Sequence, residues 1–133
     1  GSMIKRFLFA LVSIFAAWTV IDLVLPRFVL GPLYSSTPAL WRPASELNLP
    51  LIYGVVFVLI ASFFLLFERL VSPKTLGAGL QFGAILGVAI GVSVGFGTYI
   101  HMPVPLGLAW GWFLGGWVKA LAAGAILGAL PRP

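Results

Sequence analysis

The fold is decided by residues 76–100, which read LGAGLQFGAILGVAIGVSVGFGTYI. A glycine recurs at every fourth position from Gly79 to Gly95, and Gln81 is the only strongly polar side chain in this stretch. In water such a helix would be poor, because each interior glycine costs about 1 kcal/mol relative to alanine. In a bilayer, helices associate by close van der Waals packing, and small residues at this spacing let two backbones approach each other. The stretch therefore predicts a transmembrane helix that packs closely against another helix.

The composition of the whole chain is that of an integral membrane protein. Hydrophobic residues make up 61% of its 133 residues, charged residues make up 8%, and the mean hydropathy is +1.12. Cysteine is absent, which excludes disulfides, thiolate metal sites and thiol catalysis. The net charge of +5 comes from basic residues scattered singly or in one pair, so it indicates membrane topology and not nucleic-acid binding. We find no cofactor or metal motif, and we predict neither.

Four stretches have the length of a membrane span, which is roughly 20 mainly apolar residues. Gly1 and Ser2 precede Met3 and resemble a cloning scar, so we assign residues 3–133 to a single membrane domain. The short connections between the later stretches predict antiparallel neighbours. The expected fold is all-α: a polytopic, four-transmembrane-helix antiparallel bundle with glycine-zipper packing. The predicted helices cover about 4–25, 51–71, 76–100 and 104–130.

The distribution of lysine and arginine predicts the orientation, because these residues collect in the short cytoplasmic loops. We therefore expect both termini in the cytoplasm. The side with more basic residues holds Lys5, Arg6, Arg69, Lys74 and Arg132, and the other side holds Arg27 and Arg42.

The segment 26–50 forms the large outer loop in this topology. It contains five prolines and many apolar residues, and Thr37-Pro38 is typical of a helix start, with threonine as the N-cap and proline at the first helical position. Two interpretations stay open. The loop is a structured cap over the outer end of the bundle, or a stiff proline-rich connection with aromatic anchors at the interface.

The last predicted helix carries two stripes of small residues. At about 100° per residue, one stripe joins Gly107, Gly111 and Gly115, and the other joins Gly116, Ala120, Gly124 and Gly128. We expect helix packing through these stripes, either between the third and fourth helices of one chain or between copies in a homodimer; a stripe lining a pore is the alternative. On the third helix the packing positions are Gly79, Gly83, Gly87, Gly91 and Gly95.

Lys119 lies well inside the last span, on the stripe of Gly115. Charges within a membrane usually face the bundle interior with a partner, so Lys119 is a candidate for a ligand or ion pathway, together with Glu68 and Thr98. Glu68 is the expected partner because it matches Lys119 best in depth. The alternative is that the long lysine side chain snorkels to the inner surface.

A second group of polar residues is expected at the outer end of the bundle. It combines a carboxylate, one histidine and two arginines, and the arginines suit an anionic headgroup or small anion. Catalysis would need Asp22 and His101 within hydrogen-bond distance, one as a general base and the other to orient it, but nothing in their spacing requires this contact. The outer cluster consists of Asp22, Arg27, Arg42, His101, Tyr34 and Trp41, with Glu46 nearby.

The plan of the chain resembles a family of four-helix bacterial inner-membrane proteins, the DUF1761-like group. The resemblance rests on the order of the elements and on the Gly-Pro-Leu-Tyr and Trp-Arg-Pro segments at 31–34 and 41–43. It implies a bacterial inner-membrane location and carries over no functional residue.

Three functional hypotheses follow from the sequence. In the first, the protein binds or transports a small solute or lipid between its helices, with a dimer as the working unit. In the second, it is a non-transporting structural or assembly module that binds a partner protein through the glycine stripes and the outer cap. In the third, it is a membrane enzyme at the outer surface; the sequence favours the first two hypotheses over this one.

Overall fold

The computed structural model describes residues 2–25, 32, 36, 38–41 and 47–131. Within these ranges the regular structure is entirely helical, and four helices are long and apolar enough to cross a membrane. The four predicted spans are confirmed to within a few residues. The elements are α1 (Ser2–Leu25), the short 3-10 helix η2 (Pro38–Leu40), α3 (Leu49–Leu70), α4 (Leu76–Gly91), the π-helix η4 (Val92–Phe96), α5 (Gly97–His101) and α6 (Leu106–Ala129). The elements α4, η4 and α5 follow one another without a break and make up the third span.

Local side-chain chemistry explains where two of the helices begin. At the start of α3, the side chain of Asn48 accepts a hydrogen bond of 3.1 Å from the backbone N–H of Leu51. At the start of α4, the hydroxyl of Thr75 accepts one of 3.1 Å from the backbone N–H of Ala78. Each cap satisfies a backbone donor that has no partner within the helix. The tight turn between α3 and α4 is closed further by Lys74, which donates to the carbonyl of Val71 at 3.0 Å.

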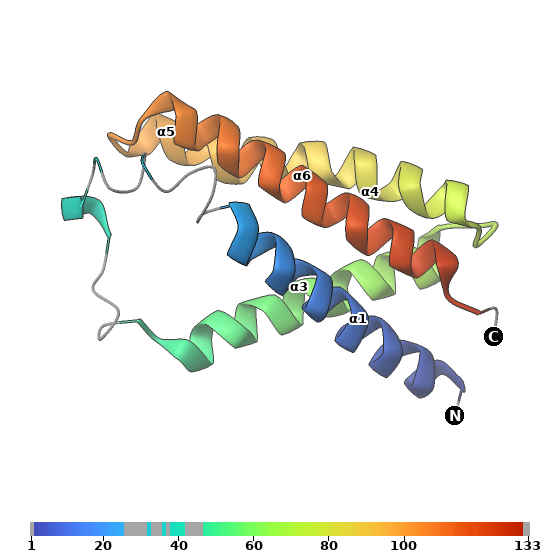
Figure 1. Cartoon of the computed structure of the whole chain (residues 1–133). Coiled ribbons are helices and arrows are strands. Elements are labelled where there is room, and N and C mark those ends of the chain that lie inside the picture. The colour runs from blue at the N-terminus through green and yellow to red at the C-terminus, as the bar shows by residue number, and fades with distance from the viewer. Residues whose placement is uncertain (1, 26–31, 33–35, 37, 42–46, 132–133) are drawn as a thin grey trace.

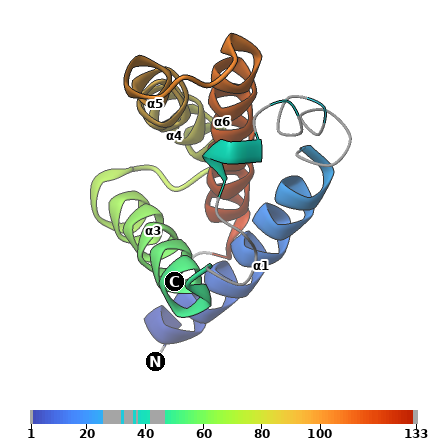
Figure 2. The same ribbon diagram turned by 90° about the vertical axis from the view of Figure 1, so that its left-hand side faces the viewer.

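The four spans form two unequal parts (Figure 1). The third span and α6 lie side by side along their whole length, whereas α1 and α3 cross each other on one side of that pair (Figures 1 and 2). The start of α1, the turn between α3 and α4, and the end of α6 all lie at one end of the molecule (Figure 1). We call this the inner end and the opposite one the outer end.

Glycines bring the backbones of α4 and α6 into direct contact. A Cβ atom added at Gly79 would collide with the carbonyl oxygen of Gly124, and one added at Gly83 would lie 2.5 Å from the carbonyl oxygen of Ala120. Farther along, a Cβ at Gly95 would collide with the carbonyl oxygen of Ala109. A single methyl group at any of these positions would push the helices apart. Trp117 ties the pair together as well, because its Nε1 donates to the carbonyl of Ala84 at 3.2 Å.

The π-helix η4 keeps the last glycine of the stripe on this contact. Positions four apart in an α-helix drift by about 40° per step, so a long four-residue stripe turns away from its partner. A π turn holds more residues than an α turn because its hydrogen bonds reach one residue further, and it therefore reverses the drift. Gly91 and Gly95 flank or lie within this segment, and both still pack against Phe113 of α6.

Aromatic side chains fill the space between α1, α3 and the third span. Phe63 contacts Trp18 of α1 with ring centroids 5.6 Å apart and Phe82 of α4 at 6.0 Å, in edge-to-face geometry. Phe67 also contacts Phe82, at 5.7 Å. Because Phe63 and Phe67 are buried near the inner end of α3, this helix is held mainly there.

The described part of the outer loop packs onto the beginning of α6. Leu40 and Trp41 cover the buried residues Val104 and Leu108, and Trp41 meets Trp112 edge to face at 6.0 Å. A helical turn does begin at Pro38, as predicted. Its proposed N-cap, Thr37, lies outside the described residues, as does most of the loop.

The contact between α4 and α6 generates a stability prediction. We expect Gly83→Ala to destabilise the protein by about 1–3 kcal/mol, because a tightly packed interface must open to admit the methyl group. The measurement is the thermal unfolding midpoint of the detergent-solubilised protein.

Gly54→Ala is the matched control, since a Cβ at this helical glycine meets nothing within 4 Å. Removing a helix-interior glycine from an open site should leave the midpoint unchanged or raise it. Equal losses in both variants would contradict the assignment of Gly83 to a close backbone contact.

Candidate functional site

The candidate site is an ion pair between α6 and α1. Lys119 Nζ lies 3.1 Å from Asp22 Oδ2, and the two side chains are 25% and 57% exposed. Lys119 comes thirteen residues after the start of α6 and ten before its end, which places its Cα about 20 and 15 Å from the two ends. The pair therefore lies within the membrane-spanning part of the molecule and not at either surface.

Trp18 fixes the position of this pair. Its indole Nε1 donates a 2.8 Å hydrogen bond to the backbone carbonyl of Lys119, and the Lys119 ammonium lies 5.0 Å from the centre of the indole ring. The indole is buried at 3% exposure, so it binds both the backbone and the charge of the same residue in a protected place. α1 is thereby locked in register against the middle of α6.

The structure corrects the predicted partner of Lys119. Glu68, the carboxylate expected to match it in depth, instead pairs with Arg6 of α1 at 2.6 Å. The interpretation that Lys119 snorkels to the inner surface is also wrong, because its side chain is bonded to Asp22 near the outer end of α1. The cause is the tilt of α1, whose outer part meets the middle of α6 and not its outer end.

The Arg6–Glu68 pair is far more enclosed than the Lys119–Asp22 pair. Its side chains are only 8% and 4% exposed, and Nε and Nη1 of Arg6 are buried without a hydrogen-bond partner. Forming such a pair costs desolvation energy, and removing one of its partners strongly destabilises the folded protein. It acts as an inner fastening between α1 and α3, and its burial leaves no open side for a ligand.

An apolar groove runs beside the candidate site. It has a volume of about 480 Å³ and lies between α1 and α3. Phe15 and Tyr53 face each other across it with ring centroids 6.1 Å apart. Asp22 follows Phe15 by seven residues, which is about 20° short of two full helical turns, so it lies on the same side of α1 and about 10 Å further toward the outer end. The groove is lined by Leu11, Val12, Phe15, Ala16, Tyr53 and Phe57.

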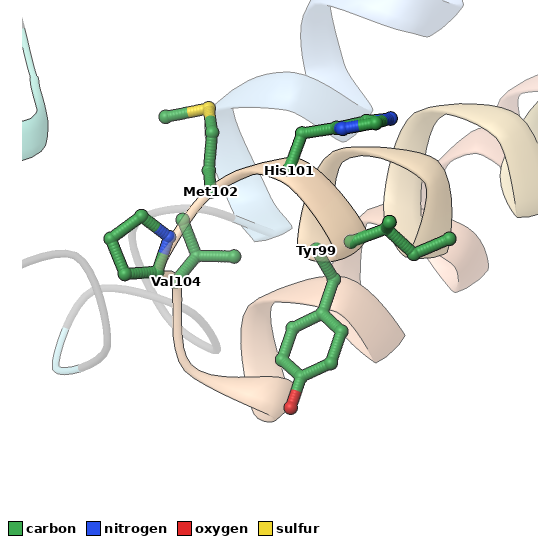
Figure 3. Close-up of a pocket in the computed structure, with 6 residues that line it drawn as sticks. Tyr99, His101, Met102 and Val104 are labelled. Carbon is green, nitrogen blue, oxygen red and sulfur yellow. The ribbon is translucent and has the colours of Figure 1, made fainter.

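The predicted residues Thr98 and His101 are not near Lys119. They line a shallow pocket of about 480 Å³ at the outer end, together with Ser93, Gly97 and Met102. An adjoining pocket of about 590 Å³ contains His101 and Met102 as well, and there Tyr99 points away from both of them (Figure 3). Lys119 lines neither of these pockets, and no contact joins His101 to Asp22 among the described residues.

Some of the remaining predicted residues lie in the described part of the chain and others do not. Trp41 packs on α6, where its ring contacts that of Trp112. Among the small-residue stripes of α6, Ala120, Gly124 and Gly128 pack against α4, whereas Gly107 is exposed, Gly111 is half-buried and Gly115 is buried. The predicted outer-cluster residues outside the described part of the chain are Arg27, Tyr34, Arg42 and Glu46.

A pattern in α1 could have revealed the two ion pairs. Every fourth residue of this helix, beginning at Arg6 and ending at Asp22, forms one stripe, and its members between those charges are buried. A stripe with this spacing drifts by about 40° per step. Arg6 consequently meets α3, while Asp22 meets α6. The stripe consists of Arg6, Ala10, Ile14, Trp18 and Asp22.

The buried inner pair yields a second prediction. Glu68→Leu should cost about 3–5 kcal/mol of stability, because it leaves the buried Arg6 without a counter-charge. The double variant Arg6→Met/Glu68→Leu removes both charges and should recover most of that loss. Thermal unfolding of the two variants in the same detergent compares them directly, and a double variant no more stable than the single one would show that the ion pair is not the cause.

In comparisons with known proteins, no family model, curated protein or solved structure matches this chain. The resemblance to the DUF1761-like group consequently stays a prediction.

Proposed function

We propose that this protein binds a small amphiphilic solute or lipid between its helices, with the apolar part in the groove between α1 and α3 and the polar part at the Lys119–Asp22 pair. The observation that carries this proposal is the ion pair within the membrane-spanning region, whose carboxylate stays 57% exposed. A purely structural pair would be expected to enclose both charges, as Arg6 and Glu68 do.

The cost of the charges supports a role for them. A lysine near the centre of a transmembrane helix costs about 2.5–3.5 kcal/mol on insertion scales, and charged residues within spans mark substrate pathways. Pairing recovers part of this cost, yet the pair at Lys119 leaves its acidic member uncovered. A polar ligand group at Asp22 would complete the site.

The groove provides the apolar half of an amphiphile site. Its lining side chains include the exposed rings of Phe15, Tyr53 and Phe57, which are 39%, 56% and 48% exposed. Because the groove lies between two membrane-spanning helices, hydrocarbon chains can enter it sideways from the bilayer. Transport is the natural extension of such binding, with a homodimer as the expected working unit because a single bundle of four helices leaves little interior.

The glycine stripes weigh against the assembly hypothesis. The close contacts of Gly79, Gly83 and Gly95 are all made to α6 of the same chain, so that face is already occupied. We propose that these contacts form a glycine zipper within an antiparallel bundle. An assembly module would therefore need another surface for its partner, such as the outer cap.

We also propose that the inner end faces the cytoplasm of a bacterium. Arg6, Arg69 and Lys74 lie near this end, in the first turns of α1, the last turn of α3 and the following turn. Basic residues flanking short connections favour the cytoplasmic side. Both termini would then be cytoplasmic and the protein would reside in the inner membrane.

The binding proposal predicts the effect of filling the groove. Ala16→Trp places an indole ring where the ligand chain would lie, and we expect the variant to retain at least about threefold less of the co-purifying amphiphile than the wild type. Native mass spectrometry of protein extracted from bacterial membranes into a mild non-ionic detergent counts the retained molecules.

Ala89→Trp is the matched control, because Ala89 is an exposed alanine on α4, away from the groove. It should retain as much as the wild type. A wild-type protein that retains nothing, or an equal loss in both variants, would overturn the proposal.

A further inference from the structure

The polar groups at the candidate site differ in how much hydrogen-bonding capacity remains. Lys119 is occupied by Asp22 and by the ring of Trp18, and the indole N–H of Trp18 is used by the carbonyl of Lys119. Thr19 lies about one helical turn before Asp22, and its hydroxyl donates a 2.8 Å hydrogen bond to the backbone carbonyl of Phe15. Of the three N–H groups of the Lys119 ammonium, one is used by Asp22, and the lysine side chain is only 25% exposed.

The Asp22 carboxylate is the more accessible of the two charged groups. An ionised carboxylate has two oxygens and about four lone-pair positions. The bond from Lys119 uses one position on Oδ2, and the Asp22 side chain is 57% exposed against 25% for Lys119. The site therefore presents a partly used, accessible carboxylate about 10 Å along α1 from Phe15 of the groove, and a ligand group that donates hydrogen bonds would fit it.

We infer that the ligand is a lipophilic cation, with an ammonium group at Asp22 and its apolar body in the groove between α1 and α3. This inference rests on the proposed function and adds the chemical class of the ligand. Hydrogen bonds between an ionised donor and a carboxylate are about twice as strong as neutral ones, which favours ammonium over hydroxyl. The lining of the groove suits the apolar body of this ligand, because Phe15, Tyr53 and Phe57 present partly exposed aromatic rings there.

The test compares three amphiphiles with the same dodecyl chain: dodecylammonium, dodecyl phosphate and the neutral dodecyl glucoside. Each is titrated against the purified full chain in micelles of tetraethylene glycol monooctyl ether, and the bound fraction is read by native mass spectrometry. We expect the wild type to bind dodecylammonium at least about tenfold more tightly than the other two, because an ionised donor bonds a carboxylate about twice as strongly as a neutral one and a phosphate is repelled by it.

Two substitutions give opposite expectations for a cationic ligand. Asp22→Asn removes the charge of the carboxylate and should weaken dodecylammonium binding about tenfold, whereas Lys119→Met removes the competing ammonium and should leave that binding unchanged or strengthen it. Size-exclusion profiles and tryptophan fluorescence confirm that both variants are folded. If Asp22→Asn fails to fold, the preference of the wild type and the response of Lys119→Met still decide the question.

The outcomes separate the inference from the proposed function. Preference for dodecyl phosphate, or loss of binding in Lys119→Met with none in Asp22→Asn, would show that the ligand is an anion held by the lysine. Equal binding of all three probes that is abolished by Ala16→Trp would leave the binding function in place and overturn the ammonium assignment. Binding of no probe by the wild type, together with no retained amphiphile in the extracted protein, would overturn both.

Discussion

The backbone contact between α4 and α6 supports the rest of the structure. Membrane helices gain little from burying apolar side chains, because lipid is as apolar as they are, so close packing must supply the attraction. Glycine and alanine on both helices allow that packing over the length of the third span, and the π-helix η4 keeps the far end of the stripe in place. The pair gives α6 a fixed position, and α6 in turn carries the lysine and the backbone carbonyl to which α1 is bound.

The two ion pairs have different physical characters although both hold α1. Near the inner end, Arg6 and Glu68 are enclosed among apolar side chains and join α1 to α3. Farther along the same stripe, Asp22 and Lys119 join α1 to α6 but remain partly open. The groove between α1 and α3 lies between these two fastenings, so the helices that line it are held at separate points. This arrangement leaves an apolar space with the carboxylate of Asp22 about 10 Å further along α1 than Phe15, which is the basis of the proposed function.

Much of the fold could be predicted from residues whose effect is local. Runs of apolar residues indicate the four spans, and Asn48 and Thr75 begin their helices through bonds to residues only three positions away. The four-residue glycine spacing indicated where a close neighbour would contact the third helix, although it left open which helix that would be. The partners in the ion pairs are harder to predict from sequence, because Lys119 and Asp22 are 97 positions apart and their contact depends on the tilt of α1. Glu68 is the wrong partner for Lys119 because the tilt of α1 brings Asp22 to the middle of α6, while Glu68 pairs with Arg6.

The amino-acid sequence alone is enough to indicate a multi-pass membrane protein, since apolar content and the length of each apolar run act along a single segment. It also determined which faces of α4 and α6 could approach closely, because only residues without a Cβ or with a small side chain permit it. Only the packed structure shows that these two faces meet within one chain, that Arg6 pairs with Glu68, and that Asp22 pairs with Lys119. These pairings depend on helix crossing angles, which arise from the packing of all four spans together and set which residues at the end of one helix meet its neighbour.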